Sequence, residues 1–443
     1  MSTKPAIGFC GLGAMGMGMA THLVKQGHPV TGFDVYAPSL EKFCSAGGTR
    51  STSLAASAAD KAFYIVMVAS SPQAQPALFG ADGIVKALPQ GATLILCSTV
   101  ASSYARSVER EMRGVGRGDV FFIDAPVSGG AGRAADGTLS IMAGASAAAL
   151  ERGKWLLEEM SAPGKLFVVD GGIGAGSNMK MVHQILAAIQ ILAVSEAYGF
   201  AARLGLNGQD VFDKVVKSQG WSWMFENRSQ RTLKEDYFPG ASAVTIILKD
   251  AGIITYMSRS VNFPSKLCSV AEQVYFSALD RGWGANDDAG LVRLWTSNPV
   301  SSISSTETSD KESKLQLVVD LLTGIHLVSA AEAISLAHHV GIPLPQLYEL
   351  ACDAAGGSEM FKQAGGNMIE ILEKKGDGTG SVLGGYTEKL KLAVDKAQEI
   401  KCPLFLGSAA LNELLATGPE LSLVKLLEAY RVAGGVQGEI EIQ

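Results

Sequence analysis

The stretch AIGFCGLGAMG, residues 6–16, places three glycines directly after a short apolar run and at the start of a helical segment. In such a GxGxxG pattern, Gly11 permits the turn, Gly13 lets the backbone approach a pyrophosphate, and Gly16 lets the helix pack on the strand. The phosphates then bind at the amino-terminal end of that helix. Taken alone, the pattern also fits an ordinary glycine-rich turn, so its context has to decide.

A carboxylate stands where a dinucleotide-binding unit needs one. Asp34 closes the next predicted strand, 21 residues after Gly13, where it can accept hydrogen bonds from both hydroxyls of an adenosine ribose. No basic residue follows in Asp34-Val35-Tyr36, so a 2′-phosphate would meet repulsion without a compensating charge. This favours NAD over NADP as the cofactor. The alternative is a solvent-exposed aspartate at a strand end.

Composition and charge narrow the class of protein. With 47% hydrophobic and 18% charged residues, the 443-residue chain is well suited to form about three globular domains. A net charge of −6 and the lack of any basic run make nucleic acid and anionic membranes poor partners. The six cysteines form no CxxC pair and no spacing with histidine, which indicates neither a disulfide framework nor a metal site. Because no targeting segment is recognisable, we expect a soluble cytoplasmic protein.

The order of predicted elements indicates an α/β fold followed by an all-α fold. Up to about Asp170, apolar runs alternate with helical stretches, which predicts a mostly parallel, doubly wound Rossmann sheet. Beyond Gly176 the strand pattern stops and apolar residues recur with the helical period. The predicted strands are AIGFCG (6–11), PVTGFDV (29–35), AFYIVMV (62–68), TLILCS (93–98), DVFFIDA (119–125), LSIMAG (139–144) and KLFVVD (165–170). The predicted ranges are 1–176 for the NAD-binding domain, 177–298 for a helical catalytic domain, 299–313 for a polar linker and 314–443 for a second helical repeat.

The two helical ranges are copies of one unit. Residues 191–225 and 327–361 align without a gap at an offset of 136, and the agreement continues after a three-residue insertion. A repeat of this size indicates that each copy buries its apolar face against the other. The matched pairs are Glu196 with Glu332, Gly205 with Gly341, Met224-Phe225 with Met360-Phe361, and Phe263-Pro264 with Cys402-Pro403.

Two further segments carry groups that suit a small acidic substrate. In Asp124-Ala-Pro-Val-Ser-Gly-Gly130, the Ser128 hydroxyl and the free amides of Gly129 and Gly130 could hold a carboxylate, although a plain strand-to-loop turn is the better explanation of this stretch taken alone. In GAGSNMKMVHQ (174–184), one lysine begins an apolar helix.

That lysine, Lys180, shares a helix face with His183 and Gln184, which follow it at i+3 and i+4. A proton-transfer group is thereby flanked by two hydrogen-bonding groups that could orient a hydroxy acid. The alternative for Lys180 is a solvated lysine, and for His183 and Gln184 it is that each makes a satisfied polar contact between helices.

With GLGAMG (11–16), DAPVSGG (124–130), GTLSIMAG (137–144), GAGSNMKMVHQ (174–184) and Lys249-Asp250 in this order and spacing, about the first 300 residues resemble the β-hydroxyacid dehydrogenases. That family includes 3-hydroxyisobutyrate, tartronate-semialdehyde and 6-phosphogluconate dehydrogenases. KMVHQILAAIQILAVSEA (180–197) and GWSWMFENR (220–228) look closest to the L-threonate dehydrogenase branch. KMVH is also similar to 6-phosphogluconate dehydrogenase, which usually has Asn at the position of Gln184 and prefers NADP.

The resemblance implies a NAD-dependent oxidoreductase in which Lys180 is the general acid/base, taking the hydroxyl proton while hydride moves to the nicotinamide. Trp223 and Phe225 would either wall the substrate pocket or only pack. The implied cofactor-binding residues are Gly11, Leu12, Gly13, Met15, Gly16, Asp34, Val68, Thr99 and Lys249. The implied substrate-binding residues are Ser128, Gly129, Gly130, His183 and Gln184.

The second copy lacks this equipment. The offset places Gln316 opposite Lys180 and Asp320 opposite Gln184, and with the insertion Glu388-Lys389 falls on Lys249-Asp250. We therefore expect a degenerate repeat that takes the place of a partner subunit, with a homodimer as a further arrangement. The retained Lys180 argues against a non-catalytic NAD-binding protein and against an imine reductase, which usually replaces this lysine.

Overall fold

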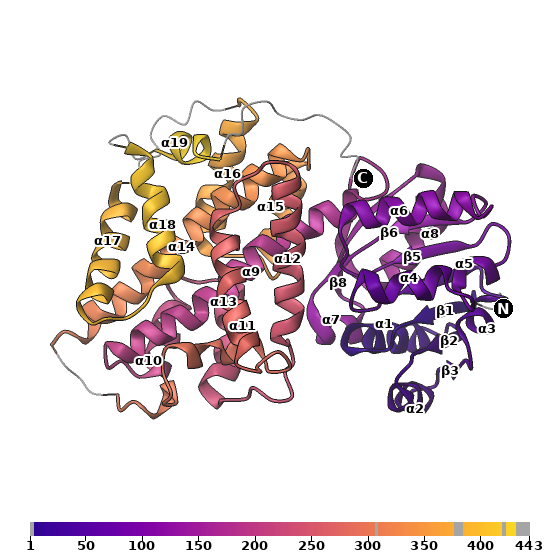
Figure 1. Cartoon of the computed structure of the whole chain (residues 1–443), viewed down its shortest axis with the longest axis horizontal. Coiled ribbons are helices and arrows are strands. Elements are labelled where there is room, and N and C mark those ends of the chain that lie inside the picture. The colour runs from indigo at the N-terminus through magenta and orange to yellow at the C-terminus, as the bar shows by residue number, and fades with distance from the viewer. Residues whose placement is uncertain (1–3, 306–308, 376–383, 419–421, 431–443) are drawn as a thin grey trace. The chain divides into compact units, whose positions relative to one another are not determined.

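A computed structural model describes residues 4–305, 309–375, 384–418 and 422–430. The chain divides into two compact units, Met1–Lys180 and Met181–Gly438 (Figure 1). The division falls within the long helix α9 (Ala175–Arg203), whose first turns belong to the first unit.

The first unit is a doubly wound α/β domain. Its described part holds a nine-stranded sheet in the order β3-β2-β1-β4-β5-β6-β8-β7, with β9 paired to β8. The strands from β3 to β6 are all parallel, and β8 runs antiparallel to β6. The strands are β1 (Ile7–Cys10), β2 (Val30–Phe33), β3 (Thr49–Arg50), β4 (Phe63–Val66), β5 (Thr93–Leu96), β6 (Phe121–Asp124), β7 (Val127–Ser128), β8 (Leu139–Ala145) and β9 (Ser161–Val168).

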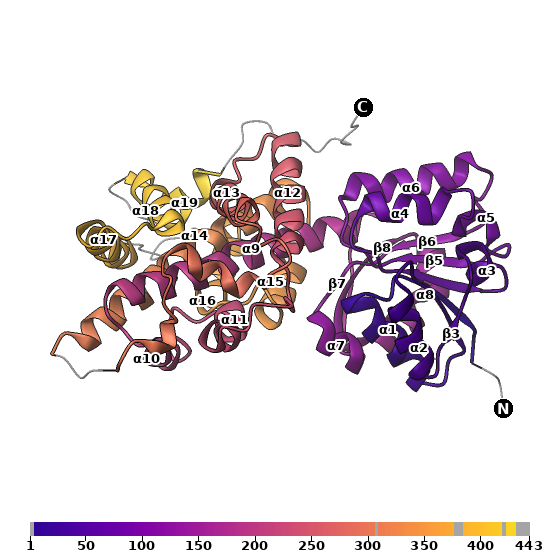
Figure 2. The same cartoon turned by 60° about the horizontal axis from the view of Figure 1, so that its bottom comes forward.

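All seven predicted strands are present, and the mostly parallel sheet is confirmed. The two-residue strands β3 and β7 were not predicted, because two residues are too short to produce a recognisable pattern. Helices lie on both faces of the sheet (Figure 2). They are α1 (Ala14–Lys25), α2 (Ala37–Ser45), α3 (Leu54–Ala58), α4 (Ser71–Phe79), α5 (Ile84–Ala87), α6 (Ser102–Gly114), α7 (Gly130–Asp136) and α8 (Ala147–Met160).

Successive residues of each central strand enter opposite cores, as the strand period requires. Ile65 and Ile95 belong to the core that also contains Phe9. Their neighbours Val66 and Leu96 belong to the core on the other face. Continuous apolar strands are therefore needed here, because both faces of the sheet are covered.

The second unit is helical throughout its described part, and its helices repeat in order. α10 and α15 begin at Gly208 and Leu344, and α11 and α16 begin at Trp223 and Glu359, which reproduces the offset of the sequence repeat. The predicted pair of tandem repeats is thus confirmed, although α14 begins three residues before the predicted start of the second copy. The elements are α10 (Gly208–Val215), α11 (Trp223–Lys234), α12 (Val244–Ser260), α13 (Lys266–Asp280), η1 (Asp288–Leu294), η2 (Val300–Ser302), α14 (Lys311–His339), α15 (Leu344–Asp353), α16 (Glu359–Leu372), α17 (Gly384–Glu399), α18 (Phe405–Ala416) and α19 (Leu423–Glu428).

The two matched glutamates bind the two copies to each other. Glu196 on α9 accepts hydrogen bonds from the amides of Leu406 and Gly407, at 3.0 and 2.8 Å, where α18 begins. Glu332 on α14 accepts hydrogen bonds in the same way from the first amides of α13, at 2.7 and 3.0 Å. Burial raises the pKa of each carboxyl to about 7, although the backbone hydrogen bonds act to lower it. Glu196 on α9 therefore caps α18 of the second copy, and Glu332 on α14 caps α13 of the first copy, an exchange with approximate twofold symmetry.

A second reciprocal contact lies at the start of α11 and α16. The Trp223 amide donates to the Gly357 carbonyl at 2.8 Å, and the Glu359 amide donates to the Trp221 carbonyl at 3.0 Å. Ser222 and Ser358, which are equivalent in the repeat, form the bridge between them. The two copies thus contact each other through equivalent residues, and the role of the second copy as a substitute for a partner subunit stays a prediction.

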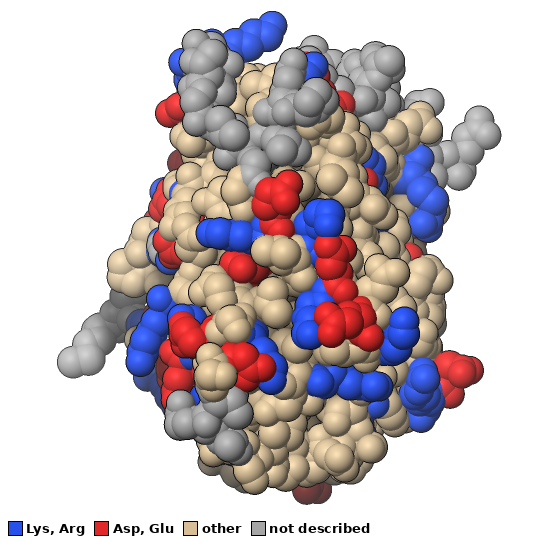
Figure 3. Space-filling view, turned by 90° about the vertical axis from the view of Figure 1, so that its left-hand side faces the viewer, with Lys and Arg blue, Asp and Glu red and all other residues tan. Residues whose placement is uncertain are grey.

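Two helices, α9 and α14, are long and apolar enough to cross a membrane by length and composition alone. In each, however, 94% of the apolar window is buried inside the structure. Burial of this kind is typical of core helices, so these two segments give only weak evidence for a membrane span. On the face of the helical unit shown in Figure 3, basic and acidic side chains are interspersed.

His326 on α14 predicts an acid-dependent loss of stability. Burial lowers its pKa to about 3, and neither ring nitrogen has a hydrogen-bond partner among the described residues. The unfolded chain takes up a proton near pH 6.5 and the folded chain does not, so stability falls as the pH drops below 6.5, by about 1.4 kcal/mol per pH unit. A His326→Gln variant removes this loss. Its free energy of unfolding relative to the native protein should therefore rise by about 2–3 kcal/mol between pH 7 and pH 4.5.

Denaturant unfolding at the two pH values measures this difference. The buried glutamates have raised pKa values and lose stability in the opposite direction, as the pH rises toward 7, but they are common to both proteins and cancel in the comparison. The exposed His338→Gln is the control and should leave the difference near zero. An unchanged pH slope in His326→Gln would contradict the assignment.

Candidate active site

The glycine loop after β1 has the geometry that a dinucleotide requires. Gly11 has φ +95°, and a Cβ there would lie 2.2 Å from the Met67 carbonyl oxygen. A Cβ on Gly16 would lie 1.9 Å from the Gly11 carbonyl oxygen, so only glycine lets α1 begin this close to the strand. Gly13, the N-cap of α1, has open space around it and supplies no side-chain cap. The first amides of α1 therefore have no side-chain cap that would compete with a phosphate.

Asp34 is tied to this loop. One carboxylate oxygen accepts the Leu12 amide at 2.6 Å, and the other accepts the Tyr36 amide at 2.8 Å. Val35 and Tyr36 are exposed. A carboxylate oxygen has two acceptor lone pairs, so Asp34 keeps capacity for ribose hydroxyls while it orders the loop.

The other predicted cofactor residues of the first unit lie at the same edge of the sheet. Val68 follows β4 and Thr99 follows β5, and the Val68 amide donates to the Ser98 hydroxyl at 2.9 Å. Because the carboxyl ends of parallel strands meet at one edge, these loops gather beside the glycine loop. Met15 on α1 is half-buried against the core. These residues fit a nicotinamide dinucleotide. Lys249, by contrast, lies on α12 in the second unit.

The Ser128-Gly129-Gly130 segment forms the turn into α7. Ser128 is buried at the end of β7, and Gly129 and Gly130 have φ values of +141° and +74°. Gly129 is the N-cap of α7 and has no side-chain cap. Successive glycine amides in such a turn can converge on an anion, which agrees with the predicted carboxylate contact.

Asp124 connects this segment to the helix of Lys180. It ends β6 with no exposed surface and accepts hydrogen bonds from the Gly174 amide at 3.1 Å, the Ser177 amide at 2.8 Å and the Ser177 hydroxyl at 2.7 Å. Burial raises the pKa of Asp124 to about 6, and these hydrogen bonds oppose the rise. Lys180 follows Ser177 by three residues and is itself buried. Asp124 thus caps the first turn of α9 and anchors the lysine to the sheet.

The glycines of GAGSNMK are needed for this close approach. A Cβ on Gly176 would lie 2.3 Å from the Met142 carbonyl oxygen and 2.7 Å from that of Asp124. The glycine-rich lead is recognisable in the sequence, but no role was predicted for Asp124. Its partners lie 50 and 53 residues further along the chain, and a spacing of this size has no recognisable pattern.

His183 and Gln184 both make polar contacts inside the second unit. The Gln184 amide group donates to Asp250 at 2.6 Å, and the Lys249 ammonium lies 3.0 Å from the other Asp250 oxygen. The Gly356 amide donates to His183 Nε2 at 3.2 Å. Gln184 therefore makes the helix–helix polar contact expected as the alternative, whereas His183 contacts the loop between α15 and α16. The structure joins Lys249 to Gln184 through Asp250, a residue for which no role was predicted.

The two aromatic residues predicted either to line the substrate pocket or to pack, Trp223 and Phe225, lie in different environments. Phe225 is fully buried and stacks on Tyr198 at a centroid distance of 5.4 Å and beside Phe212 at 6.5 Å. Packing, and not a pocket wall, is its role. Trp223 is half-buried, and its backbone makes the contact with Gly357 described above.

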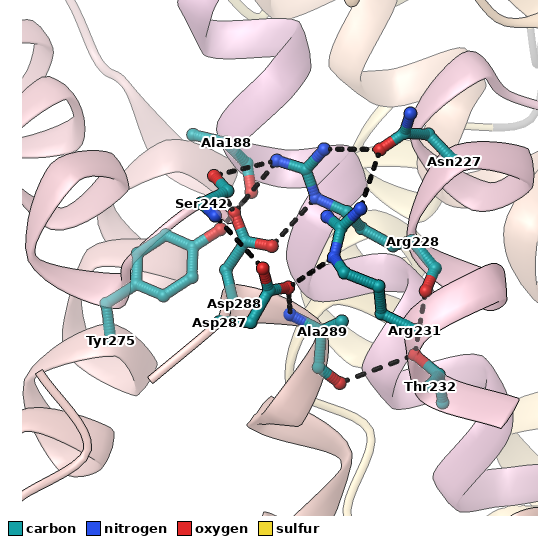
Figure 4. A network of polar contacts seen from close by, with 10 residues as sticks. All are labelled: Ala188, Asn227, Arg228, Arg231, Thr232, Ser242, Tyr275, Asp287, Asp288 and Ala289. Carbon is teal, nitrogen blue, oxygen red and sulfur yellow. Dashed lines mark hydrogen bonds and ion pairs between the residues drawn. The ribbon is translucent and has the colours of Figure 1, made fainter. Parts of the chain in front are cut away.

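A buried ion-pair network holds α11 to the segment around η1 (Figure 4). Arg228 donates to both oxygens of Asp288, at 2.7 and 2.9 Å, and to the Ser242 hydroxyl at 3.0 Å. Arg231 donates to Asp287 at 2.8 Å, and the same carboxylate accepts the Ser242 amide at 3.0 Å. Ser242 lies two residues before the start of α12, the helix that carries Lys249 and Asp250. The network therefore orders the entry into that helix.

Comparison with known proteins agrees with this organisation. Residues 6–174 match the NAD binding domain of 6-phosphogluconate dehydrogenase, and residues 174–295 match the NAD-binding domain of NADP-dependent 3-hydroxyisobutyrate dehydrogenase. L-threonate dehydrogenase of Escherichia coli K12 is 35% identical over 291 residues, which span 66% of this chain and 94% of the relative. The chain belongs to the β-hydroxyacid dehydrogenase family. Mouse mitochondrial 3-hydroxyisobutyrate dehydrogenase is 31% identical over 299 residues, which span 66% of this chain and 88% of the relative.

Solved structures in this family cover the chain to different extents. A Salmonella typhimurium 3-hydroxyisobutyrate dehydrogenase matches 66% of this chain and 100% of its own, with a TM-score of 0.61 and 32% identity. Plasmodium falciparum 6-phosphogluconate dehydrogenase matches 92% of this chain and 91% of its own, with a TM-score of 0.67 and 17% identity. The latter likeness shows that a fold with both helical copies exists elsewhere. As a β-hydroxyacid dehydrogenase, this protein is an NAD(P)-dependent oxidoreductase.

Proposed function

We propose that this protein oxidises a small hydroxy acid such as L-threonate, with NAD as hydride acceptor and Lys180 as general acid/base. The observation that carries the proposal is the anchoring of Lys180. Asp124 and Ser177 fix the start of its helix to the sheet beside the Ser128-Gly129-Gly130 turn. The similarity to L-threonate dehydrogenases over the whole catalytic part supports the choice of substrate class.

The residues divide the work as follows. A bound nicotinamide ring supplies the hydride acceptor. Lys180 takes the proton of the substrate hydroxyl as the carbonyl forms, which general-base catalysis requires. Ser128 and the amides of Gly129 and Gly130 hold the substrate carboxylate. His183 and Gln184, one turn further along α9, orient the remaining hydroxyls.

The direct test is the absorbance at 340 nm with NAD or NADP and a panel of C3–C6 hydroxy acids. The panel includes L-threonate, 3-hydroxyisobutyrate and 6-phosphogluconate. We expect turnover of a short sugar acid with NAD. Absence of turnover with every acid and both cofactors would favour a non-catalytic nucleotide-binding protein.

Asp34 should set the choice between NAD and NADP. In Asp34→Ser the repulsion of a 2′-phosphate and two ribose hydrogen bonds are lost together, so the ratio of kcat/KM for NADP to that for NAD should rise at least about tenfold. Steady-state kinetics with both cofactors measure the ratio. Asp82, which also accepts backbone amides in the first unit, gives the matched control Asp82→Ser. If both variants shift the ratio equally, Asp34 does not read the ribose.

A further inference from the structure

The loop between α15 and α16, in the second copy, is held by two side chains of the catalytic copy. The Gly356 amide donates to His183 Nε2 at 3.2 Å, and the Gln190 amide group donates to the Gly356 carbonyl at 2.8 Å. His183 and Gln190 have no exposed surface, and both lie on α9. The amide and the carbonyl of Gly356 in the second copy are therefore both hydrogen-bonded to α9, the helix that carries Lys180.

The equivalent position of the other copy lacks this polar clamp. The repeat places Gly220 opposite Gly356, Val319 opposite His183 and His326 opposite Gln190. Valine cannot accept a hydrogen bond from the Gly220 amide through its side chain. Neither nitrogen of His326 has a hydrogen-bond partner in the part of the chain that the structure describes. The symmetrical fold alone therefore does not require the clamp, which exists only on the side of the proposed active site.

The two glycines are alike in their packing. A Cβ on Gly356 would lie 3.0 Å from Leu186 Cδ1 and 3.3 Å from His183 Cδ2. A Cβ on Gly220 would lie 3.2 Å from the Val319 carbonyl oxygen and 3.3 Å from Leu322 Cβ. Both loops approach the opposite long helix closely, so the pair separates the steric role of the glycine from its contact with His183.

The hydrogen bond also determines the chemistry of the ring. A backbone amide only donates, so His183 Nε2 must accept with its lone pair, and the proton of the neutral imidazole must reside on Nδ1. We propose that Gly356 is a positioning residue that fixes His183 in the Nδ1–H tautomer. Nδ1 is buried in this structure, and a substrate that reaches it then meets an N–H donor and no acceptor nitrogen. The inference rests on the proposed function, under which His183 binds the hydroxy acid, and it selects substrates that present an oxygen acceptor to the ring.

The tautomer can be tested without any substrate. In protein labelled with ¹⁵N-histidine, two-bond ¹H–¹⁵N correlation spectra distinguish the two neutral tautomers of each of the six histidines. A His183→Gln variant identifies the signals of this ring. The proposal expects a protonated Nδ1 and an unprotonated Nε2 near neutral pH. A protonated Nε2, or averaged signals of a ring that exchanges between tautomers, would overturn it whether or not the protein turns over hydroxy acids.

The functional part is tested with Gly356→Ala and its matched control Gly220→Ala. Gly356→Ala should shift the His183 ring signals and raise the KM of the acid about tenfold with a smaller change in kcat, since one hydrogen bond of the site is displaced. Gly220→Ala should change neither, although both should reduce thermal stability to a similar degree. Equal KM values in the two variants would reject the positioning role.

If Gly356→Ala does not fold, Gln190→Met removes the hydrogen bond to the Gly356 carbonyl without adding bulk to the loop. Gln190→Met should also raise the KM of the acid, and it should shift or average the His183 ring signals. Unchanged KM and unchanged ring signals in this variant would equally reject the proposal.

Discussion

The kcat of a Lys180→Met variant is expected to be about 10²- to 10⁴-fold lower than that of the native protein, because a positioned general acid/base contributes a rate factor in this range. Methionine has nearly the same length and suits a buried helix position, so the loss reports the missing proton acceptor and not a collapsed site. Lys180 is only 5% exposed, and water has little access to replace it. Lys180→Arg should be similarly impaired, because a guanidinium does not give up its proton in the accessible pH range.

The control is another buried lysine of the same unit. Lys61 is 6% exposed and pairs with Asp60, outside the loops that form the site. Lys61→Met should retain kcat while it loses some stability. Binding of NAD, followed by protein fluorescence, should be intact in Lys180→Met because the glycine loop and Asp34 are unchanged. If Lys180→Met retains a kcat within threefold of the native protein, Lys180 does not carry the proton.

The sequence predicted well those features that local spacing encodes. The GxGxxG loop with Asp34, the seven strands and the helical repeat depend on short-range pattern or on self-similarity, and all are present in the structure. The shared helix face of Lys180, His183 and Gln184 follows from helical period alone. Glu196 and Glu332 were found as matched positions of the repeat, and the structure shows the reason for the match.

The unpredicted parts of the site are contacts between distant residues. Gln184 binds Asp250 across 66 residues, and His183 accepts from Gly356 across 173. The hydrogen-bond partner of each of these side chains depends on how the helices pack, and no periodic pattern in the sequence contains that information. The sequence therefore supported a structural role for His183 and Gln184 as well as it supported substrate binding. The structure shows the structural contacts, and substrate binding by the same residues remains a proposal.

The second copy keeps the packing of the first but has Gln316 at the position of Lys180. Where the first copy joins Gln184 to Asp250, the second has Asp320, whose pKa is raised by burial and lowered by Gln316 and by Lys389. The acidic residue has moved to the long helix and its partner is now basic. The attraction of Lys389 for the Asp320 carboxylate thus stands where the first copy has an amide–carboxylate hydrogen bond.

The largest loss of stability is expected from Arg228→Met. Burial acts to lower the pKa of the Arg228 guanidinium, but Asp288 raises it, so the guanidinium stays charged inside the protein. Removing it leaves Asp288, a carboxylate with no exposed surface, without its ion pair. Breaking a buried pair in this way costs about 3–5 kcal/mol. Denaturant unfolding, with the m-value checked, measures the change. The exposed pair of Arg113 with Glu109 is the control, and Arg113→Met should cost less than about 1 kcal/mol.

The double variant Arg228→Met/Asp288→Leu distinguishes an unpaired charge from a lost contact. If the cost of Arg228→Met is mainly the uncompensated carboxylate, removing that carboxylate as well should restore part of the stability, because two apolar side chains need no partner. If the double variant is instead less stable than either single variant, the network stabilises chiefly through its hydrogen bonds to Ser242 and Asn227, which neither replacement can make. An Arg228→Met variant within 1 kcal/mol of the native protein would contradict both accounts and would mean that water enters the site to solvate Asp288.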